Sequence, residues 1–134
     1  MYQWGITFIR AITGFIFLMH GIAKLQMGVD NVSAWFGSIG LPTSLAYLVI
    51  LIEVLGGIAL IVGLGSRYVA IFMILTMIGA IFSVKLSAGL MGDGKGAGYE
   101  LDLALIALNL LFVLKPYEGV GIDSYLQKGR NQNN

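Results

Sequence analysis

The chain has 134 residues, of which 57% are hydrophobic and 11% are charged, with a net charge of +1 and a mean hydropathy of +0.86. Soluble domains carry about 25% charged residues, so this composition excludes an ordinary soluble protein and indicates a membrane protein. The small net charge gives no reason to expect a nucleic-acid partner. The chain has no cysteine, which excludes disulfides, thiolate chemistry and cysteine-ligated metal centres within it.

Four stretches are long and apolar enough to be membrane-spanning helices. A span needs about 20 mostly apolar residues, because a hydrocarbon core of about 30 Å is crossed at a rise of 1.5 Å per residue. The first stretch is too long for the apolar region of a signal peptide, so we expect it to be retained. The predicted spans are residues 5–27, 43–64, 67–89 and 99–115. Residues 116–134 are predicted to form a polar C-terminal tail. We therefore predict an all-α integral membrane four-helix bundle that forms a single domain, 1–134.

The connections predict how these spans are joined. Almost nothing separates the second span from the third, so the two form a tight antiparallel hairpin. Between the first two spans, DNVSAWFGSIGLP predicts a short interfacial helix that begins at Asp30 or Asn31. Trp35 and Phe36 of this segment suit the depth of the lipid headgroups. Between the last two spans, LMGDGKGAG lacks the spacing of a phosphate-binding loop and indicates a flexible turn.

Basic residues are divided unequally between the two sides of the membrane. With four spans, both termini and the loop between the second and third spans share one side. Most basic loop residues lie on that side, namely Arg67, Lys115, Lys128 and Arg130. The positive-inside rule therefore predicts a multi-pass plasma-membrane protein with both termini in the cytoplasm. The ionisable residues near the other ends of the spans then lie toward the outer leaflet.

The polar side chains of the first span share one face. At about 100° per residue, Arg10, His20 and Lys24 fall within an arc of roughly 100°. In the second span Glu53 shares its face with Gly56, Gly57 and Leu60, and small residues there let another helix approach closely. An unpaired charge inside a bilayer is costly, so we expect Glu53 to face the first span. Arg10 has the longest reach and is the expected partner of Glu53 in a structural clamp.

The third and fourth spans carry the other ionisable groups. A stripe of small residues predicts a packing seam on the third span, formed by Thr76, Gly79, Ala80, Ser83 and Ser87. Lys85 lies roughly opposite this stripe, where snorkelling to the interface and a pocket role are both open. Glu100 and Asp102 lie about 200° apart, so they cannot serve the same neighbour, and each also suits the N-terminal end of a helix. No broken helix is evident.

Several segments, in order along the chain, carry a family resemblance. They are R-x3-G followed by HGIAKL, then WFGSIGLP, E-x2-GGIALIVGLGSR, GAGYELDLALIAL and GVGIDSYL. Together they resemble the DoxX family of small four-helix membrane proteins over nearly the whole chain. The stretch VKLSAGLMGDGKGAGYELDLAL is most similar to the CatD- and MhqP-type oxidoreductases of Firmicutes. The resemblance implies a plasma-membrane bundle and a link to quinone oxidoreduction, although GVGIDSYL departs from the expected GPG pattern.

The residues limit which redox chemistry the chain can perform. One histidine and no cysteine cannot supply a bis-histidine haem or a metal cluster, so we expect no metal site and no intrinsic cofactor. With the resemblance, this favours an oxidoreductase, or a subunit of one, that acts with a quinone-like small molecule. Hydrogen bonding to quinone oxygens and proton relay are assigned to His20, Lys24, Glu53 and Glu100 as catalytic residues. Substrate binding is assigned to Arg10, Phe17, Trp35, Lys85, Tyr99 and Asp102.

Two other classes of function stay open. Buried charges also suit a small transport or permeation protein, although four helices are few for alternating access without oligomerisation. A non-catalytic membrane subunit that anchors a redox partner is the second alternative. The expected partners are the lipid bilayer, a quinone or small aromatic ligand, and a redox subunit or further copies of the chain.

Overall fold

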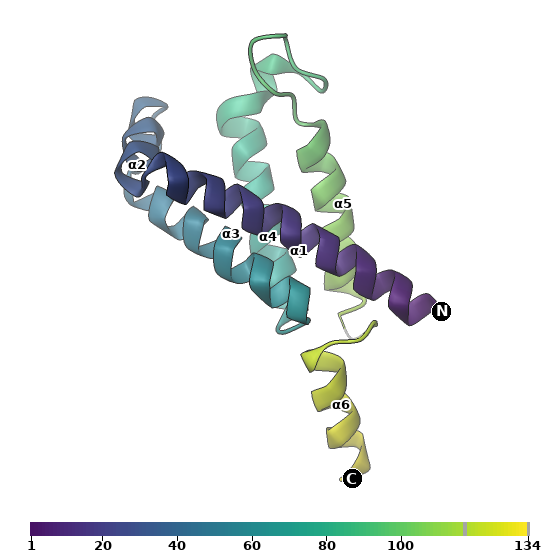
Figure 1. Cartoon of the computed structure of the whole chain (residues 1–134). Helices are drawn as coiled ribbons and strands as arrows, with labels where there is room; N and C mark the ends of the chain where they lie inside the picture. The colour runs from purple at the N-terminus through teal and green to yellow at the C-terminus, as the bar shows by residue number, and fades with distance from the viewer. Residues whose placement is uncertain (117, 134) are drawn as a thin grey trace.

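The computed structural model describes residues 1–116 and 118–133, and the prediction of an all-α fold is confirmed over this part of the chain. This part of the chain forms six α-helices, arranged as Figure 1 shows. They are α1 (Tyr2–Met27), α2 (Val29–Ser38), α3 (Ser44–Val62), α4 (Ser66–Ala80), α5 (Glu100–Leu114) and α6 (Ile122–Gln132). After α4 the chain continues as a π-helix, η1 (Ile81–Lys85), and a 3₁₀ turn, η2 (Leu86–Ala88).

Three helical stretches are long and apolar enough to cross a membrane. They are Tyr2–Met27, Ser44–Val62 and Ser66–Ala88. The fourth predicted span, 99–115, corresponds to α5, whose 15 residues are fewer than the about 20 that a span usually needs. The structure thus supports a membrane protein with three clear candidate spans.

The helices form two pairs that diverge from a tight turn. α1 lies along α3, α4 lies along α5, and residues 63–65 join α3 to α4 in the predicted hairpin (Figure 1). The first pair is in close backbone contact, since a Cβ added to Gly14 would lie 2.6 Å from the carbonyl oxygen of Gly57. Small residues allow this approach, which membrane helices use where packing drives their association.

The buried side chains form two clusters, of which the first holds the two helix pairs together. One lies among α1, α3, α4 and α5 and includes Phe17, Met73 and Phe112. The other joins α2 to the first half of α3 and includes Phe36 and Ile50. The helices are therefore well packed near the turn and again beneath α2, and the space where α3 and α4 diverge is bounded by both clusters.

Arg10 does not pair with Glu53, so the predicted clamp between these two residues is wrong. The Arg10 side chain is 3% exposed, and its Nε donates to the carbonyl oxygen of Leu60 at 2.9 Å. Its Nη2 donates to the carbonyl oxygen of Val120 at 2.6 Å. The last carbonyls of a helix have no intrahelical partner and carry partial negative charge, which explains why a guanidinium binds at the end of α3.

The predicted polar tail, 116–134, contains the helix α6, which its composition did not reveal. The first turn of α6 docks on the hairpin between α3 and α4. The Asp123 carboxylate accepts hydrogen bonds from the backbone N–H groups of Gly65 and Ser66, both at 2.9 Å. In return the Asp123 N–H donates to the carbonyl oxygen of Gly63 at 2.8 Å. Asp123 therefore satisfies free N–H groups at the start of α4, as an N-cap residue would.

Candidate functional site

A cavity of about 560 Å³ lies where α3 and α4 diverge. Residues from α1, α2, α3, α4, η1 and α5 line it, and most of the lining side chains are apolar. The polar side chains that line it are His20, Lys24, Glu53, Thr76, Ser83, Lys85 and Asp102. Its size and its few polar groups in an apolar wall are typical of sites for small organic ligands.

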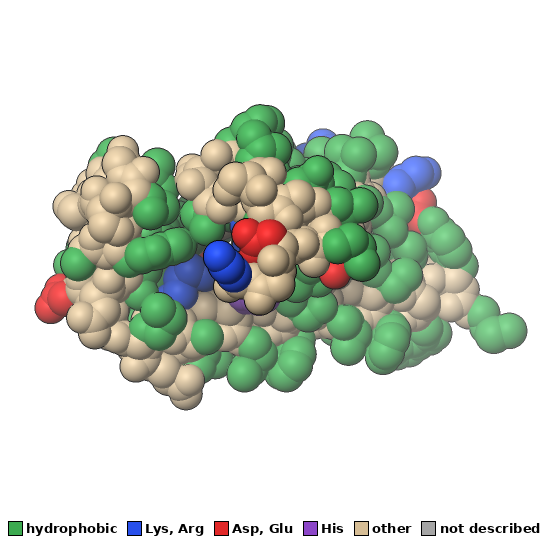
Figure 2. Space-filling model, turned by 90° about the horizontal axis from the view of Figure 1, so that it is seen from above, with side chains coloured by type: hydrophobic (Ala, Val, Ile, Leu, Met, Phe, Trp, Pro, Cys, Tyr) green, Lys and Arg blue, Asp and Glu red, His purple; other side chains and the backbone are tan. Residues whose placement is uncertain are grey.

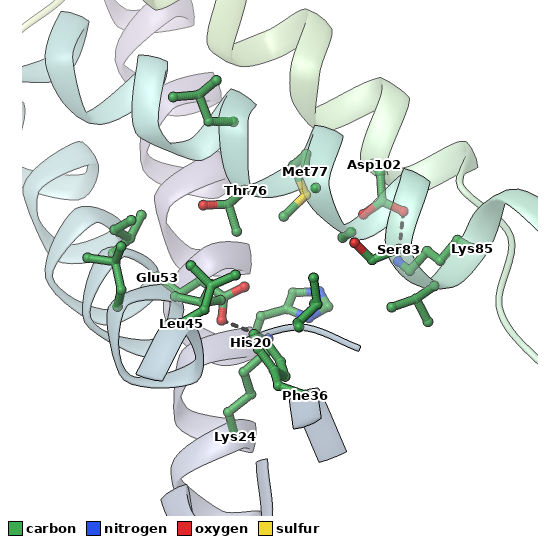
Figure 3. A pocket seen from close by; sticks show the side chains of 18 of the residues that line it. His20, Lys24, Phe36, Leu45, Glu53, Thr76, Met77, Ser83, Lys85 and Asp102 are labelled. Atoms are coloured by element: carbon green, nitrogen blue, oxygen red, sulfur yellow. Dashed lines mark hydrogen bonds and ion pairs between the residues drawn. The ribbon is translucent and has the colours of Figure 1, made fainter. Parts of the chain in front are cut away.

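The first polar group of the cavity is an ion pair between α1 and α3. Lys24 Nζ lies 2.7 Å from Glu53 Oε2, and the Glu53 side chain is only 3% exposed (Figure 3). Close helix packing permits the contact, since a Cβ added to Gly21 would lie 3.2 Å from the Glu53 Cβ. The prediction that Glu53 faces the first helix is confirmed, with Lys24 in place of Arg10 as its partner.

The second polar group is an ion pair between η1 and α5. Lys85 Nζ lies 2.7 Å from Asp102 Oδ2, and the Asp102 side chain is 4% exposed. An α-helix would have placed Lys85 opposite Thr76 and Ser83, yet all three line the same cavity. The π-helical turn of η1 winds the chain more slowly than an α-helix does, which reduces the angle between Thr76 and Lys85. The long Lys85 side chain then extends to Asp102 on α5. Single π-turns inside helices are frequently found at functional sites.

His20 lies on α1 one turn before Lys24. Figure 3 shows its ring close to the Lys24–Glu53 pair, and the side chain lines the cavity. Histidine is the side chain that most readily gains or loses a proton near neutral pH. The position of His20 is therefore suited to donating a hydrogen bond or a proton to a ligand beside the first ion pair.

Charged groups gather in a hollow at this end of the molecule. Figure 2 looks down on the lobe formed by α2 and on the lobe formed by the glycine-rich loop after η2. Basic side chains lie in the recess between these lobes, which show backbone and hydrophobic side chains at their surfaces.

The structure brings together six of the ten residues to which site roles were assigned. These six line the cavity and are His20, Lys24, Trp35, Glu53, Lys85 and Asp102. The other four are outside its lining. The Arg10 side chain of α1 binds the C-terminal end of α3, and Phe17 is fully buried in the main core cluster. Tyr99 is half-buried, and Glu100 is exposed in the first turn of α5, where the helix dipole favours an acidic residue.

Sequence reasoning did not assign Thr76 or Ser83 to the site. The stripe of small residues on α4 that predicted a packing seam faces the cavity at Thr76, Gly79, Ala80 and Ser83. Small side chains leave room for a neighbour, and a sequence does not show whether that neighbour is a helix or a ligand. Over the described residues, no three His, Cys, Asp or Glu side chains lie together as metal ligands would.

Comparison with known proteins agrees with this picture. The DoxX family model matches residues 5–86, which include His20, Lys24, Glu53 and Lys85. The chain belongs to the DoxX family. As a DoxX protein with three apolar helices of membrane-spanning length, it is a membrane protein. Asp102 lies beyond the matched residues, so the second ion pair joins the DoxX region to the remainder of the chain.

Three relatives of this DoxX protein are similar over most of their length. A Bacillus subtilis protein named "Putative oxidoreductase CatD" is 37% identical over 133 residues, which are 99% of this chain and 95% of the relative. An uncharacterized membrane protein of Mycobacterium tuberculosis is 32% identical over 116 residues, which cover 79% of this chain and 71% of the relative. An uncharacterized Haemophilus influenzae protein is 29% identical over 126 residues, which cover 89% of this chain and 88% of the relative. No solved structure matches the chain.

Proposed function

We propose that this DoxX protein is a membrane oxidoreductase, or a subunit of one, that binds a quinone in the cavity. The observation that carries the proposal is the presence of two lysine–carboxylate pairs, Lys24–Glu53 and Lys85–Asp102, in a single and mostly apolar cavity. A quinone has a flat apolar ring with carbonyl oxygens on its edge. Each lysine ammonium has three N–H donors and gives one to its carboxylate, so donors remain for such oxygens.

The ion pairs themselves favour a ligand-binding role. Moving two charges out of water is costly, and replacing a buried pair by apolar residues is often neutral or stabilising. Stabilisation of the fold is therefore a poor explanation for two such ion pairs in a bundle this small. Trp35 and Phe36 at the α2 side supply aromatic surface against which a ring would pack.

The chemistry assigned to the chain is proton transfer and orientation. Reduction of a quinone to a quinol takes up two electrons and two protons. The electrons would come from a redox partner at the membrane surface, since one histidine and no cysteine supply no redox centre of their own. His20, Glu53 and Asp102 would move protons at the cavity as general acids and bases. The name of the Bacillus subtilis relative also points to an oxidoreductase.

The same proposal includes how the protein sits in the membrane. We take α5 as the fourth span of a four-helix bundle, because it packs along α4 and contributes Leu105 and Phe112 to the core. With both termini in the cytoplasm, α2 lies at the outer surface of the plasma membrane. The cavity then faces the outer leaflet.

The test is quinone binding by the purified full chain in lipid nanodiscs, with quinone reductase activity measured in membranes with and without the protein. We expect saturable binding and a change in reductase activity. A chain that binds no quinone and leaves the activity unchanged would overturn the proposal. Solute or ion flux in proteoliposomes without any redox partner would instead establish the transport alternative.

A further inference from the structure

We infer that the ligand of the cavity is a quinone with a long isoprenoid tail, and that its tail lies between α3 and α4 and continues into the bilayer. This inference rests on the proposed function and specifies the class of its substrate. It concerns the apolar side of the cavity, away from the two ion pairs.

The side of the cavity between α3 and α4 is open and apolar. Leu48 on α3 and Phe72 and Leu75 on α4 all line the cavity, yet they are 51%, 53% and 58% exposed. Side chains that line a cavity and are also half exposed lie at its opening. Ile52 also lines this side, so the lining side chains that α3 and α4 contribute here include four large apolar ones.

The opening lies at the depth of lipid acyl chains. Ile52 is at the middle of the 19-residue helix α3, and Leu75 is near the middle of the 23-residue stretch Ser66–Ala88. The middle of a spanning helix lies in the hydrocarbon core, where water is absent. A molecule that passes through this opening therefore comes from the bilayer.

The opening also has room for a chain. Gly79 lines the cavity one turn beyond Leu75, and a Cβ added to Gly79 would meet nothing within 4 Å. An alkyl or isoprenoid chain needs no hydrogen-bond partner and suits walls made of leucine, isoleucine and phenylalanine. A ring bound between Lys24 and Lys85 would leave this apolar space unfilled, whereas a tail attached to the ring would occupy it.

The experiment compares two probes with the same head group. Menaquinone carries an isoprenoid tail, and menadione is the same naphthoquinone ring without one. Binding of each probe to the full chain in nanodiscs is measured by affinity capture and chromatographic quantification of the retained quinone. Ligand concentrations are expressed as mole fractions of the lipid, so that partitioning into the bilayer cancels. The opening is narrowed by Leu48→Trp or, separately, by Leu75→Trp.

Matched controls are Ile58→Trp on α3 and Ile71→Trp on α4, which are exposed positions outside the cavity lining. We expect each narrowing variant to weaken menaquinone binding at least tenfold and menadione binding less than twofold, with both controls like the wild type. Equal loss of both probes, or unchanged menaquinone binding in both narrowing variants, overturns the inference and leaves the quinone site in place. Failure of the wild type to bind either probe overturns the proposed function and the inference with it.

Discussion

Lys24 on α1 holds the carboxylate of Glu53 on α3 at 2.7 Å, and this contact forms one edge of the cavity. The lysine is 22% exposed and the glutamate 3% exposed. The Glu53 carboxylate therefore depends more on its partner than the Lys24 ammonium does, because Lys24 is partly exposed and Glu53 is buried.

Removing one partner of this pair should cost more than removing both. Lys24→Met leaves Glu53 buried without a counter-charge, and we expect it to lower the free energy of unfolding by about 3 kcal/mol, the low end of values for buried pairs. Glu53→Gln should cost less, and the double variant should recover most of the loss. Thermal unfolding in detergent measures all three. Rescue of Glu53→Gln by Arg10→Gln in place of Lys24→Met would contradict the observed pairing.

Arg10 should matter for stability and not for the ligand. Arg10→Met removes two charge-assisted hydrogen bonds, to Leu60 and Val120, each worth about 1.5–3 kcal/mol. We expect lower thermal stability and faster proteolysis of α6, whose first turn lies beside this contact. Quinone affinity should stay within twofold of the wild type. A large loss of affinity with normal stability would return Arg10 to the binding site.

His20 should act at the ligand and not in folding. His20 is exposed on the cavity wall, so His20→Ala should leave the thermal unfolding temperature nearly unchanged. Quinone binding should fall at least tenfold, as measured by the nanodisc assay. Wild-type binding in this variant would reduce His20 to a packing residue.

The contact between α1 and α3 should not tolerate a methyl group. Gly14→Ala would place a Cβ 2.6 Å from the carbonyl oxygen of Gly57, and overpacking of this kind costs about 1–3 kcal/mol. Gly5→Ala is the matched control on the same helix, because its Cβ would meet nothing within 4 Å. Thermal unfolding should separate the two variants, with Gly5→Ala at least as stable as the wild type.

The glycine-rich loop should respond to acid through Asp93. The backbone N–H groups of Gly96 and Lys95 donate to Asp93 Oδ1, at 2.8 and 3.0 Å, and hold the pKa of this carboxyl below its ordinary value. The ionised form is thus favoured in the folded loop. This stabilisation is present above the ordinary aspartate pKa of about 4 and is lost as pH falls through the lowered pKa. The amide NMR shift of Gly96 should follow that titration, and Asp93→Asn should abolish it.

The sequence predicted the parts of the site that depend on helical periodicity. Glu53 shares a face with Gly57, and this pattern correctly indicated close packing against α1, since a Cβ added to Gly57 would lie 2.7 Å from the Gly14 carbonyl oxygen. Gly56, on the same predicted face, lies against Met73 of α4 instead. The choice between Arg10 and Lys24 could not be made in the same way, because the backbone carbonyls of Leu60 and Val120 that bind Arg10 have no signature in the sequence. The angle predicted between Lys85 and Thr76 assumes an α-helix throughout, and the π-turn of η1 breaks that assumption.

The central claim is that the ion pairs Lys24–Glu53 and Lys85–Asp102 serve a ligand. Neutralising each pair in a separate double variant tests this claim most directly. One double variant combines Lys24→Met with Glu53→Gln, and the other combines Lys85→Met with Asp102→Asn. Both should unfold near the wild-type temperature, since paired removal leaves no buried charge unpartnered. Each should bind menaquinone at least tenfold more weakly in nanodiscs. Stably folded double variants that bind menaquinone as the wild type does would contradict the claim.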